Sequence, residues 1–510
     1  MLPTRFLQNK KTYISYNNFR KNTFSQLAPK DSEAILYLLP WLLSVNHPSF
    51  PGYVKDIVKP FKVYGVDMDK DVLKREPVFK TMFGMKKEGT LLRYPTGVNL
   101  IPGIYTIGSV GTVSQTSRSD CDIWICIDQK AFDEKATTQF NQKLNLIKAW
   151  FDAHLKMPVY FFISDLDDIR NCNFGNVSEE SSGSTQRNIL KEEFYRTSIL
   201  ICGKIPLWWA CYDDDRPVNY HQLLDEYDRD VYGDNDFIDL GKMESIERGE
   251  YVGAALWQFN KSLTYPLKSI IKMLLLEMLL VSSREELLCH QFRHSILSQG
   301  VNPVYNDPSM FTMEAILRHN EGLDADSFEF IKKCFYLRYK IKFQSKKVTL
   351  KETLAKELFQ KYPIAREEIC RLNEFSGWPF HEQTEFGDRV LSLLRNIYKG
   401  ISTLQRGATQ GIDHQDLTII GRKLSSCLEK KANKIPIMHK PIENPDLPVL
   451  TFRNEGKRWQ VHPHKDPSRF IVKSPDIIHC LAYLVWNDIC LSGNIRMSPN
   501  PTPVTLQGIM

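Results

Sequence analysis

The chain opens with a polar stretch, and the spacing of its apolar residues then changes several times. From Asp31 to Val45 the apolar positions are dense enough for a helix, which the turn-forming residues 47–52 end. Around 99–128 short apolar runs separated by Gly, Ser and Thr predict strands, most clearly within 122–127. A helical spacing over 131–155 and a further strand at 159–163 follow. Strand, helix and strand in succession predict a core of mixed α and β structure.

The rest of the chain is mainly helical in pattern. Residues 171–184 predict a loop and residues 185–202 a helix, and long amphipathic stretches continue from 251 to about 398. The proline-spaced segment 435–448 is typical of a linker, and 450–472 alternates as strands do. We divide the chain into a helical N-terminal lead (1–95), a catalytic core (96–215), a helical domain (216–400) and a C-terminal segment (401–510).

Composition narrows the class of protein only slightly. The 66 Lys and Arg residues against 60 Asp and Glu give a net charge of +6, and the basic clusters are short, so we predict no nucleic-acid partner. The 11 cysteines contain no Cys-x-x-Cys pair, which favours reduced thiols in a cytoplasmic protein. The apolar stretch 269–281 carries Lys272 and Glu277 and is too short to span a membrane, so a buried helix is predicted there and no stable membrane insertion.

Two aspartates mark the start of the strand at 122–127. Alternate side chains of a strand share a face, so Asp120, Asp122 and Trp124 point to one side, and Cys121 and Ile123 to the other. Two carboxylates at this spacing suit a hard divalent cation such as Mg²⁺, which prefers oxygen ligands and substrate phosphates. For an Asp-x-Asp pattern alone, solvated aspartates at a strand end are the commoner interpretation.

A Gly-Ser pair lies ten residues before the first of these aspartates. Gly108 and Ser109 follow the apolar run 104–107 and offer backbone N–H groups, a hydroxyl and no obstructing Gly side chain. This pattern suits the binding of phosphate oxygens, although an ordinary turn after a strand is an equally good interpretation. Neither a Walker motif nor a Rossmann fingerprint is present.

Together these residues resemble a known signature. Gly-Ser, a spacer of about ten residues and Asp-x-Asp on a strand is the pattern of the DNA polymerase β-like nucleotidyltransferases. The fuller segments 105–109 and 119–126 are similar to those of class I adenylate cyclases, the enterobacterial type, and further matches follow in order at 38–43, 183–186, 193–197, 250–258 and 334–337. The resemblance covers residues 30–345 well. It implies an α+β fold in which a nucleotidyltransferase-type mixed sheet with flanking helices precedes a mainly helical domain and a small C-terminal α/β segment.

The resemblance also implies roles for individual residues at the site. Ser109, beside Gly108, would hold the β- and γ-phosphates, and Asp120 and Asp122 would bind the metal and carry catalysis with Ser109. Ser119 and Trp124 would shape the nucleotide site.

Further charged residues are implied around this centre. A third acidic metal ligand is expected on a neighbouring strand, with Asp165 best placed and Asp167 and Asp168 as alternatives. Arg196 and Lys204 would neutralise the triphosphate, on similar helix faces if one unbroken helix carries both. Asp307 falls where the family has an acidic residue, although a turn-forming aspartate is also plausible.

The implied activity is conversion of ATP to 3′,5′-cyclic AMP and pyrophosphate, with Mg²⁺ as cofactor and Mn²⁺ as a substitute. A nucleotidyltransferase acting on a separate protein or RNA acceptor, and a non-catalytic nucleotide-binding homologue, are the alternatives. Class I cyclases usually continue into a C-terminal region that responds to the sugar phosphotransferase system. Because this sequence ends at Met510, we expect a fragment, a truncated form or a short family member, with 401–510 as the affected segment, which leaves such a regulatory partner open.

Overall fold

The computed structural model describes residues 3–509 except 86–88, 93–98, 118, 175–185, 215–216, 282–285, 303–305, 342, 344–347, most of 405–433, 440–448, 465–468 and 490–493. Its α-helices are α1 (Pro3–Leu27), α2 (Pro29–Glu33), α3 (Leu39–Ser44), α4 (Lys70–Met82), α5 (Glu134–His154), α6 (Leu166–Arg170), α7 (Arg187–Thr197), α8 (Tyr220–Asp228), α9 (Arg248–Lys261), α10 (Pro266–Val281), α11 (Leu288–Gln299), α12 (Pro308–His319), α13 (Ala325–Tyr339), α14 (Leu350–Lys361), α15 (Arg366–Asn373), α16 (Phe380–Leu404), α18 (Ile477–Trp486) and α19 (Leu506–Ile509). Its strands are β1 (Gly103–Ile107), β2 (Cys121–Ile127), β3 (Val159–Asp165), β4 (Ile199–Gly203), β5 (Ile205–Pro206), β6 (Phe237–Ile238), β7 (Leu450–Glu455), β8 (Arg458–Pro463), β9 (Val472–Ser474) and β10 (Ile495–Met497).

The central sheet has four strands in the order β3-β2-β1-β4. Strand β1 is antiparallel to both β2 and β4, whereas β2 and β3 run parallel. The strands predicted at 122–127 and 159–163 are therefore confirmed, as is the helix between them, which is α5. Strand β1 lies within the stretch 99–128 for which short strands were predicted. The fold is α+β with a mixed sheet, as expected.

The helix predicted over 185–202 is wrong in its second half. Helix α7 ends at Thr197, Ser198 is extended, and β4 begins at Ile199. The run Ile199–Cys202 is buried throughout and pairs with β1, so tertiary pairing decides its conformation over local helical spacing. Most of the loop predicted at 171–184 lies outside the described residues.

The two faces of the sheet belong to different hydrophobic clusters. Cys121, Ile123 and Ile125 pack against the N-terminal helices and α5, whereas Trp124 and Cys126 face α7 and the helical region. The alternation predicted for β2 is thereby confirmed, and the face that carries Asp122 is the one turned toward the helical region. The helix predicted over 31–45 is also helical, as α2, a π-helical turn at Ala34–Leu38 and α3.

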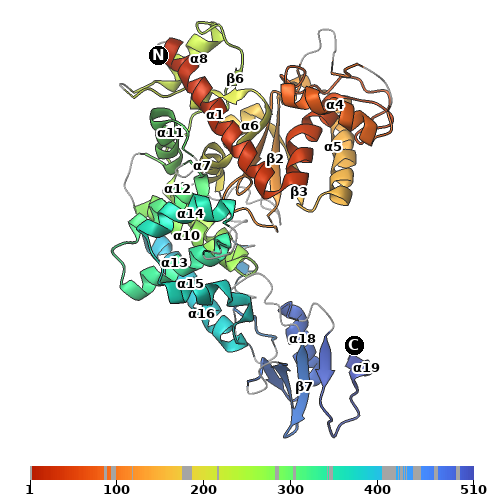
Figure 1. Ribbon diagram of the computed structural model, residues 1–510, viewed down its shortest axis with the longest axis vertical. Coiled ribbons are helices and arrows are strands. Elements are labelled where there is room, and N and C mark those ends of the chain that lie inside the picture. The colour runs from red at the N-terminus through yellow and green to blue at the C-terminus, as the bar shows by residue number, and fades with distance from the viewer. Residues whose placement is uncertain are drawn as a thin grey trace.

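Helix α1 lies within the helical N-terminal lead, but its own bounds were not predicted, because its charged and amide residues hide the pattern of its aromatic ones. Phe6, Tyr13, Tyr16 and Phe24 are buried, and so is Arg20. The helix runs diagonally across the upper part of the molecule and packs on β4 and α11 (Figure 1). It therefore ties the first residues of the chain to the edge of the sheet.

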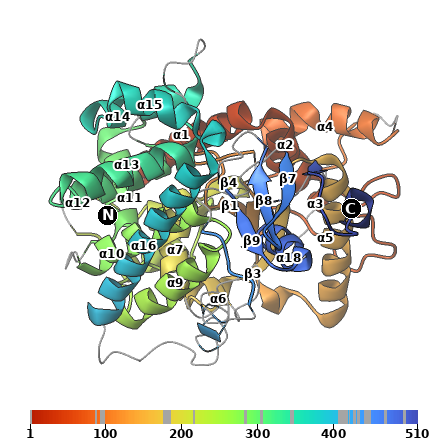
Figure 2. The same ribbon diagram turned by 90° about the horizontal axis from the view of Figure 1, so that it is seen from below.

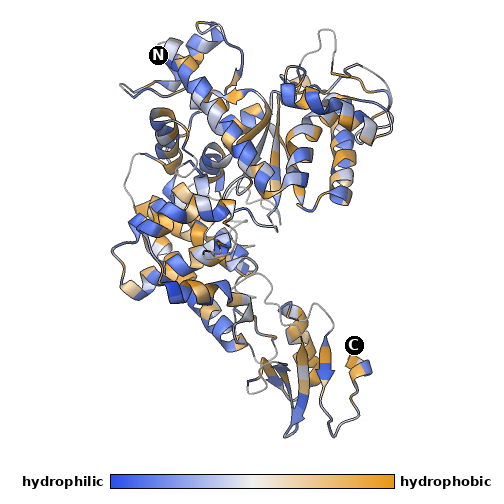
Figure 3. Cartoon of the chain, in the orientation of Figure 1, coloured by the Kyte–Doolittle hydropathy of each residue, from blue (hydrophilic) through white to orange (hydrophobic). Residues whose placement is uncertain are grey.

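The helical domain predicted after the sheet is present as α9–α16, including the buried helix α10. Figure 1 shows α11 beside the sheet, α10 and α13–α16 below it, and a separate C-terminal unit beyond them. That unit contains β10-β7-β8-β9 in this order and α18 (Figure 2). In Figure 3 α18 is coloured mostly hydrophobic, and its Ile478, Val485 and Trp486 are exposed.

Two further properties concern only the described part of the chain. None of its helices is both long and apolar enough to cross a membrane. Nine of the cysteines lie in it, and none of these nine forms a disulfide.

Candidate active site at one end of the sheet

The Gly108-Ser109 turn lies directly after β1. Gly108 has φ +91°, and no atom lies within 4 Å of the position that a Cβ would occupy, so a ligand can approach the backbone closely. Its N–H donates to Oγ1 of Thr197 at the end of α7 (2.9 Å). Arg20 of α1 donates to the carbonyl oxygens of Val110 (2.9 Å), Gly111 (3.1 Å) and Thr197 (2.9 Å). Contacts from α1 and α7 therefore hold the turn in place.

Two serines connect the start and the end of the loop between β1 and β2. The Oγ atoms of Ser109 and Ser119 are 3.3 Å apart, and Ser119 Oγ accepts the N–H of Thr116 (2.9 Å). Because Asp120 follows Ser119 directly, the predicted phosphate-binding serine lies beside the first predicted metal ligand.

The pair of aspartates lies at the same end of the sheet. Asp122 is opposite Ile107 in the β1–β2 register, so it neighbours the Gly108 turn. Burial, reinforced by the charge of Asp120, raises the pKa of Asp122 to about 7. Two carboxylates that disfavour each other's charge fit a divalent cation, which would relieve the repulsion. Among the described residues no group of three or more His, Cys, Asp or Glu side chains could hold a metal.

Trp124 is a buried residue next to this site. Its ring stacks on Phe194 of α7 with centroids 4.8 Å apart and planes at 9°, and only 4% of the residue is exposed. Trp124 therefore lies in the core, two residues from Asp122 on the same face of β2, and its stacking aligns α7 with β2. Any influence of Trp124 on a nucleotide is exerted through the position of Asp122.

The loop is also held from the helical domain. Asp307 is fully buried at the start of α12, where one carboxylate oxygen accepts the N–H groups of Ser309 (2.9 Å) and Met310 (3.0 Å). The other oxygen accepts the N–H of Val113 in the loop (2.8 Å). Asp307 is thus both the helix-capping residue that the alternative interpretation expected and a direct anchor of the loop.

Three helices add further contacts to the same loop. Ser309 Oγ of α12 hydrogen-bonds Thr112 Oγ1 and Ser114 Oγ, each at 2.9 Å. Arg338 of α13 donates to the carbonyl oxygen of Ser114 (3.1 Å), and Lys351 of α14 donates to that of Gln115. The loop that carries Ser109 and Ser119 is therefore part of a rigid junction between sheet and helical domain.

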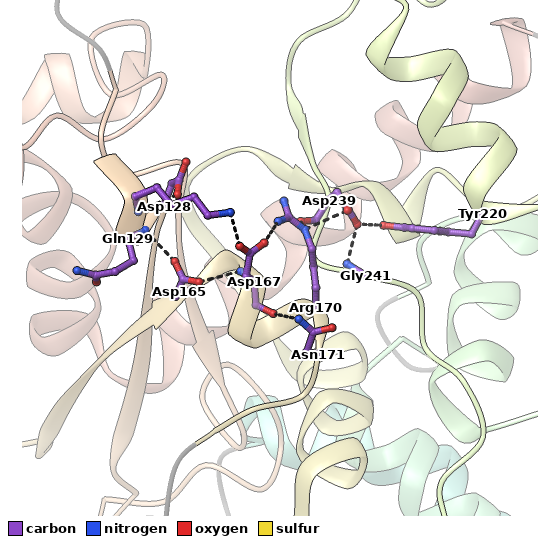
Figure 4. Close-up of polar contacts among 10 residues, drawn as sticks. Asp128, Gln129, Asp165, Asp167, Arg170, Asn171, Tyr220, Asp239 and Gly241 are labelled. Carbon is purple, nitrogen blue, oxygen red and sulfur yellow. Dashed lines mark hydrogen bonds and ion pairs between the residues drawn. The ribbon is translucent and has the colours of Figure 1, made fainter. Parts of the chain in front are cut away.

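Asp165 does not join this site. In the parallel β2–β3 register Asp122 is opposite Tyr160 and Asp165 is opposite Ile127, so the two aspartates are separated by five positions along the strands, roughly 16 Å. Asp165 instead accepts the N–H groups of Gln129 (2.7 Å) and Asp167 (3.0 Å), and so caps α6 (Figure 4).

The two alternatives to Asp165 lie at the same far end. Asp167 pairs with Lys130 (2.7 Å) and Arg170 (2.6 Å), and Asp168 accepts from Asn173 (3.0 Å). The placement of the third ligand by strand order alone is thus corrected, because parallel pairing puts the end of β3 away from the start of β2.

Lys204 is also at the far end of the sheet. Its N–H donates to the carbonyl oxygen of Pro102, six residues before Gly108 along β1, which is roughly 20 Å away. Its ammonium group lies over the ring of Tyr64, 4.8 Å from the centroid. The expected helix that would have aligned Lys204 with Arg196 is interrupted by β4.

Arg196 is close to the loop but already has partners. It is 6% exposed and makes two hydrogen bonds of 3.0 Å to Glu192, and a third of 2.7 Å to Thr312 of α12. It therefore joins α7 to α12 and supports the junction behind the Gly108 turn.

Three charged residues near the site were not predicted. Glu193 of α7 and Lys272 of α10 form an ion pair, and Lys268 lies one helical turn before Lys272. All three contribute to the electrostatic environment of Asp122. Lys272 had a visible signal, because it interrupts an apolar helix, and Glu193 lies in one of the segments that carry the resemblance.

The fold and the site define a nucleotidyltransferase-type core, with a Gly-Ser turn and an Asp-x-Asp strand at one end of a mixed sheet. Residues 6–209 match the family model for the adenylate cyclase NT domain, and residues 246–439 match that for the class-I adenylate cyclase second domain. The chain therefore belongs to the class I adenylate cyclase family.

Individual relatives agree with the family models. The chain is 28% identical over 432 residues to adenylate cyclases of Shigella flexneri, Escherichia coli strain K12 and Haemophilus influenzae, covering 82%, 82% and 80% of its own length. It spans about half, 50%, of the length of each of these relatives. No solved structure is detectably similar.

Proposed function

We propose that this chain converts ATP to 3′,5′-cyclic AMP and pyrophosphate at the end of the sheet that carries Gly108 and Asp122. The observation that supports this most strongly is the pair of adjacent carboxylates, Asp120 and Asp122, beside an open Gly108-Ser109 turn in a chain of the class I family. The relatives bearing the name adenylate cyclase are about twice as long, so activity of this chain by itself is part of the proposal.

Asp120 and Asp122 would hold Mg²⁺ or Mn²⁺. When bound, the metal would lower the pKa of the ribose 3′-hydroxyl and stabilise charge on the phosphates. The Oγ of Ser109 and the open backbone at Gly108 are suited to the phosphate oxygens. The anchoring of the loop by Arg20, Thr197 and Asp307 would keep these groups in place, which matters because an intramolecular reaction depends largely on positioning.

The reaction needs no acceptor molecule. A bond forms between the ribose O3′ and the α-phosphorus of the same ATP, and the bond from that phosphorus to the α,β-bridging oxygen breaks. Pyrophosphate leaves with that electron pair, and the 3′-hydroxyl proton passes to water. We place the enzyme in the cytoplasm, where ATP is available and where its cysteines would remain thiols.

The test is incubation of the purified chain with ATP and Mg²⁺ or Mn²⁺, with products separated by chromatography. Cyclic AMP and pyrophosphate should form with the unmodified chain and not with Asp120→Asn/Asp122→Asn. Unchanged ATP with a folded, nucleotide-binding chain would contradict the proposal and would favour transfer to a separate acceptor.

A further inference from the structure

An ion pair between α7 and α10 borders the carboxylates of the site. Lys272 Nζ lies 3.0 and 3.1 Å from the two carboxylate oxygens of Glu193, and the Glu193 side chain is only 18% exposed. Lys268 precedes Lys272 by four residues on α10, so the two lysines share a helix face. Among the described residues, Lys268 has no ion-pair partner. Of these two half-buried lysines, Lys272 is therefore ion-paired and Lys268 is not, within the described part of the chain.

The position of this pair follows from its neighbours on α7. Thr197, one turn after Glu193, accepts the N–H of Gly108, and Phe194 stacks on Trp124, two residues from Asp122 on the same strand face. Glu193 thus lies between the Gly108 turn and the face of β2 that carries Asp122. The ion pair brings Lys272 there with it, and Lys268 lies on the same face of α10 one turn earlier.

The site requires cations beyond its metal. A triphosphate brings several negative charges to a place that already holds Asp120, Asp122 and Glu193. Arg196 is committed to Glu192 and Thr312, and Lys204 lies at the opposite end of the sheet. Lysine is an effective point-charge binder of phosphate oxygens, and the two lysines of α10 face the correct end.

We propose that Lys268 and Lys272 bind the triphosphate of the substrate, and that Glu193 holds Lys272 in position before the nucleotide arrives. This inference rests on the proposed function for the identity of the nucleotide. The ammonium groups would contact non-bridging oxygens of the phosphates and would stay with the pyrophosphate as its charge increases. Removing either should therefore weaken binding of both ATP and pyrophosphate.

The decisive experiment compares Lys268→Met and Lys272→Met with Lys399→Met, which removes an exposed lysine of α16. Methionine keeps the apolar stem, and thermal unfolding of each variant verifies the fold. We expect each α10 variant to raise the KM for ATP and the inhibition constant of pyrophosphate by about tenfold or more. Lys268→Arg should recover part of the affinity, because it restores the charge.

Comparing Glu193→Gln with Lys272→Met distinguishes a role of Lys272 in binding the triphosphate from a role of the ion pair in holding α7 against α10. Glu193→Gln removes the charge that positions Lys272 but keeps an oxygen acceptor for its ammonium, so the KM for ATP should rise less than in Lys272→Met. A purely structural ion pair would make Glu193→Gln and Lys272→Met equally damaging. If both α10 variants keep the KM and the pyrophosphate inhibition of Lys399→Met, the inference is wrong while the cyclase activity stands.

Failure of the proposed function is recognisable separately. If the unmodified chain makes no cyclic AMP, calorimetric titration with ATP and Mg²⁺ tests the lysines by affinity alone. A tenfold larger dissociation constant for ATP in Lys268→Met and Lys272→Met would still support the inference, and equal dissociation constants in all variants would overturn it.

Discussion

Charged residues lie at both ends of the central sheet, but their partners differ between the two ends. At the far end Asp165 caps a helix, Asp167 pairs with Lys130 and Arg170, and Arg170 also contacts Asp239 (3.0 Å), so each charge has a partner within the chain (Figure 4). At the near end Asp120 and Asp122 repel each other beside an open glycine turn. An acidic cluster that is internally neutralised stabilises a fold, whereas one that remains unbalanced is suited to a cationic ligand.

The largest expected effect is the loss of activity on Asp122→Asn. Removing one of the two carboxylates should reduce cyclic AMP formation about a hundredfold or more, because metal stabilisation contributes several kcal/mol. The free energy of unfolding should stay the same or rise, because a repulsive, partly buried charge is removed. Activity assays and urea unfolding measure the two effects. Retention of activity, or parallel loss of activity and stability, would contradict the assignment of the near end as the site.

The next effect concerns the loop anchor, for which the chain offers a matched pair of variants. Asp307→Asn keeps an oxygen to cap α12 but turns an amide N–H₂ toward the N–H of Val113. Activity should fall about 10- to 100-fold through displacement of the loop. Stability should fall less than in Asp307→Ala, which loses cap and anchor together at a cost of about 2–3 kcal/mol. Equal losses of stability in Asp307→Asn and Asp307→Ala would show that the cap and the Val113 contact do not contribute separately to stability.

Sequence patterns predicted much of this fold because they depend on local spacing. The alternation in β2 was visible, and so were the apolar runs of β1 and β3 and the helices after 251. Strand β4 was missed because its four apolar residues directly follow helical spacing, and the difference is decided by pairing with β1. The N-terminal lead was expected to be helical, but the bounds of α1 were not predicted because Asn, Lys and Gln residues interrupt its aromatic face.

The centre of the site was predictable to a similar degree, and its surroundings were not. Asp120, Asp122, Ser109 and Ser119 were found because they lie within one short segment, and the structure brings them together. The placement of Asp165 depended on strand direction, which no local pattern records. Lys268, on a helix 146 residues after Asp122, looks like any solvated charge until the fold brings α10 to the sheet.

A smaller effect is expected at the far end of the sheet. Asp165→Ala removes the cap of α6 and the acceptor of the Gln129 N–H, and should lower the free energy of unfolding by about 1 kcal/mol. Cyclic AMP formation should stay within about twofold of the unmodified chain, because roughly 16 Å separate this residue from Asp122. A hundredfold loss of activity with an intact fold would remove the contrast between the two ends.

The last effect concerns how a buried cation at the near end responds to pH. Lys351 donates to the loop at Gln115, and burial, with Arg338 and Lys340 nearby, lowers its pKa to about 7. Between about pH 7 and pH 10.5 the unfolded chain keeps a proton that the folded chain releases. The penalty for burying the charged ammonium is therefore fully present below pH 7 and is relieved as the pH rises through this window.

Unfolding by urea at pH 7, 8 and 9 measures this contribution. Lys351→Met should reduce the increase of stability with pH by up to about 1 kcal/mol per pH unit. It should not abolish the increase, because the pKa of Lys143, which is buried on the opposite face of the sheet, is likewise lowered to about 7. Lys143→Met serves as the matched control, with a similar change in slope and no loss of cyclase activity, since its ammonium donates to the carbonyl oxygens of Val45 and Gly52, away from the loop. If Lys351→Met leaves the slope unchanged, the ammonium at the loop is solvated, and the loop at the near end is held less rigidly than its contacts indicate.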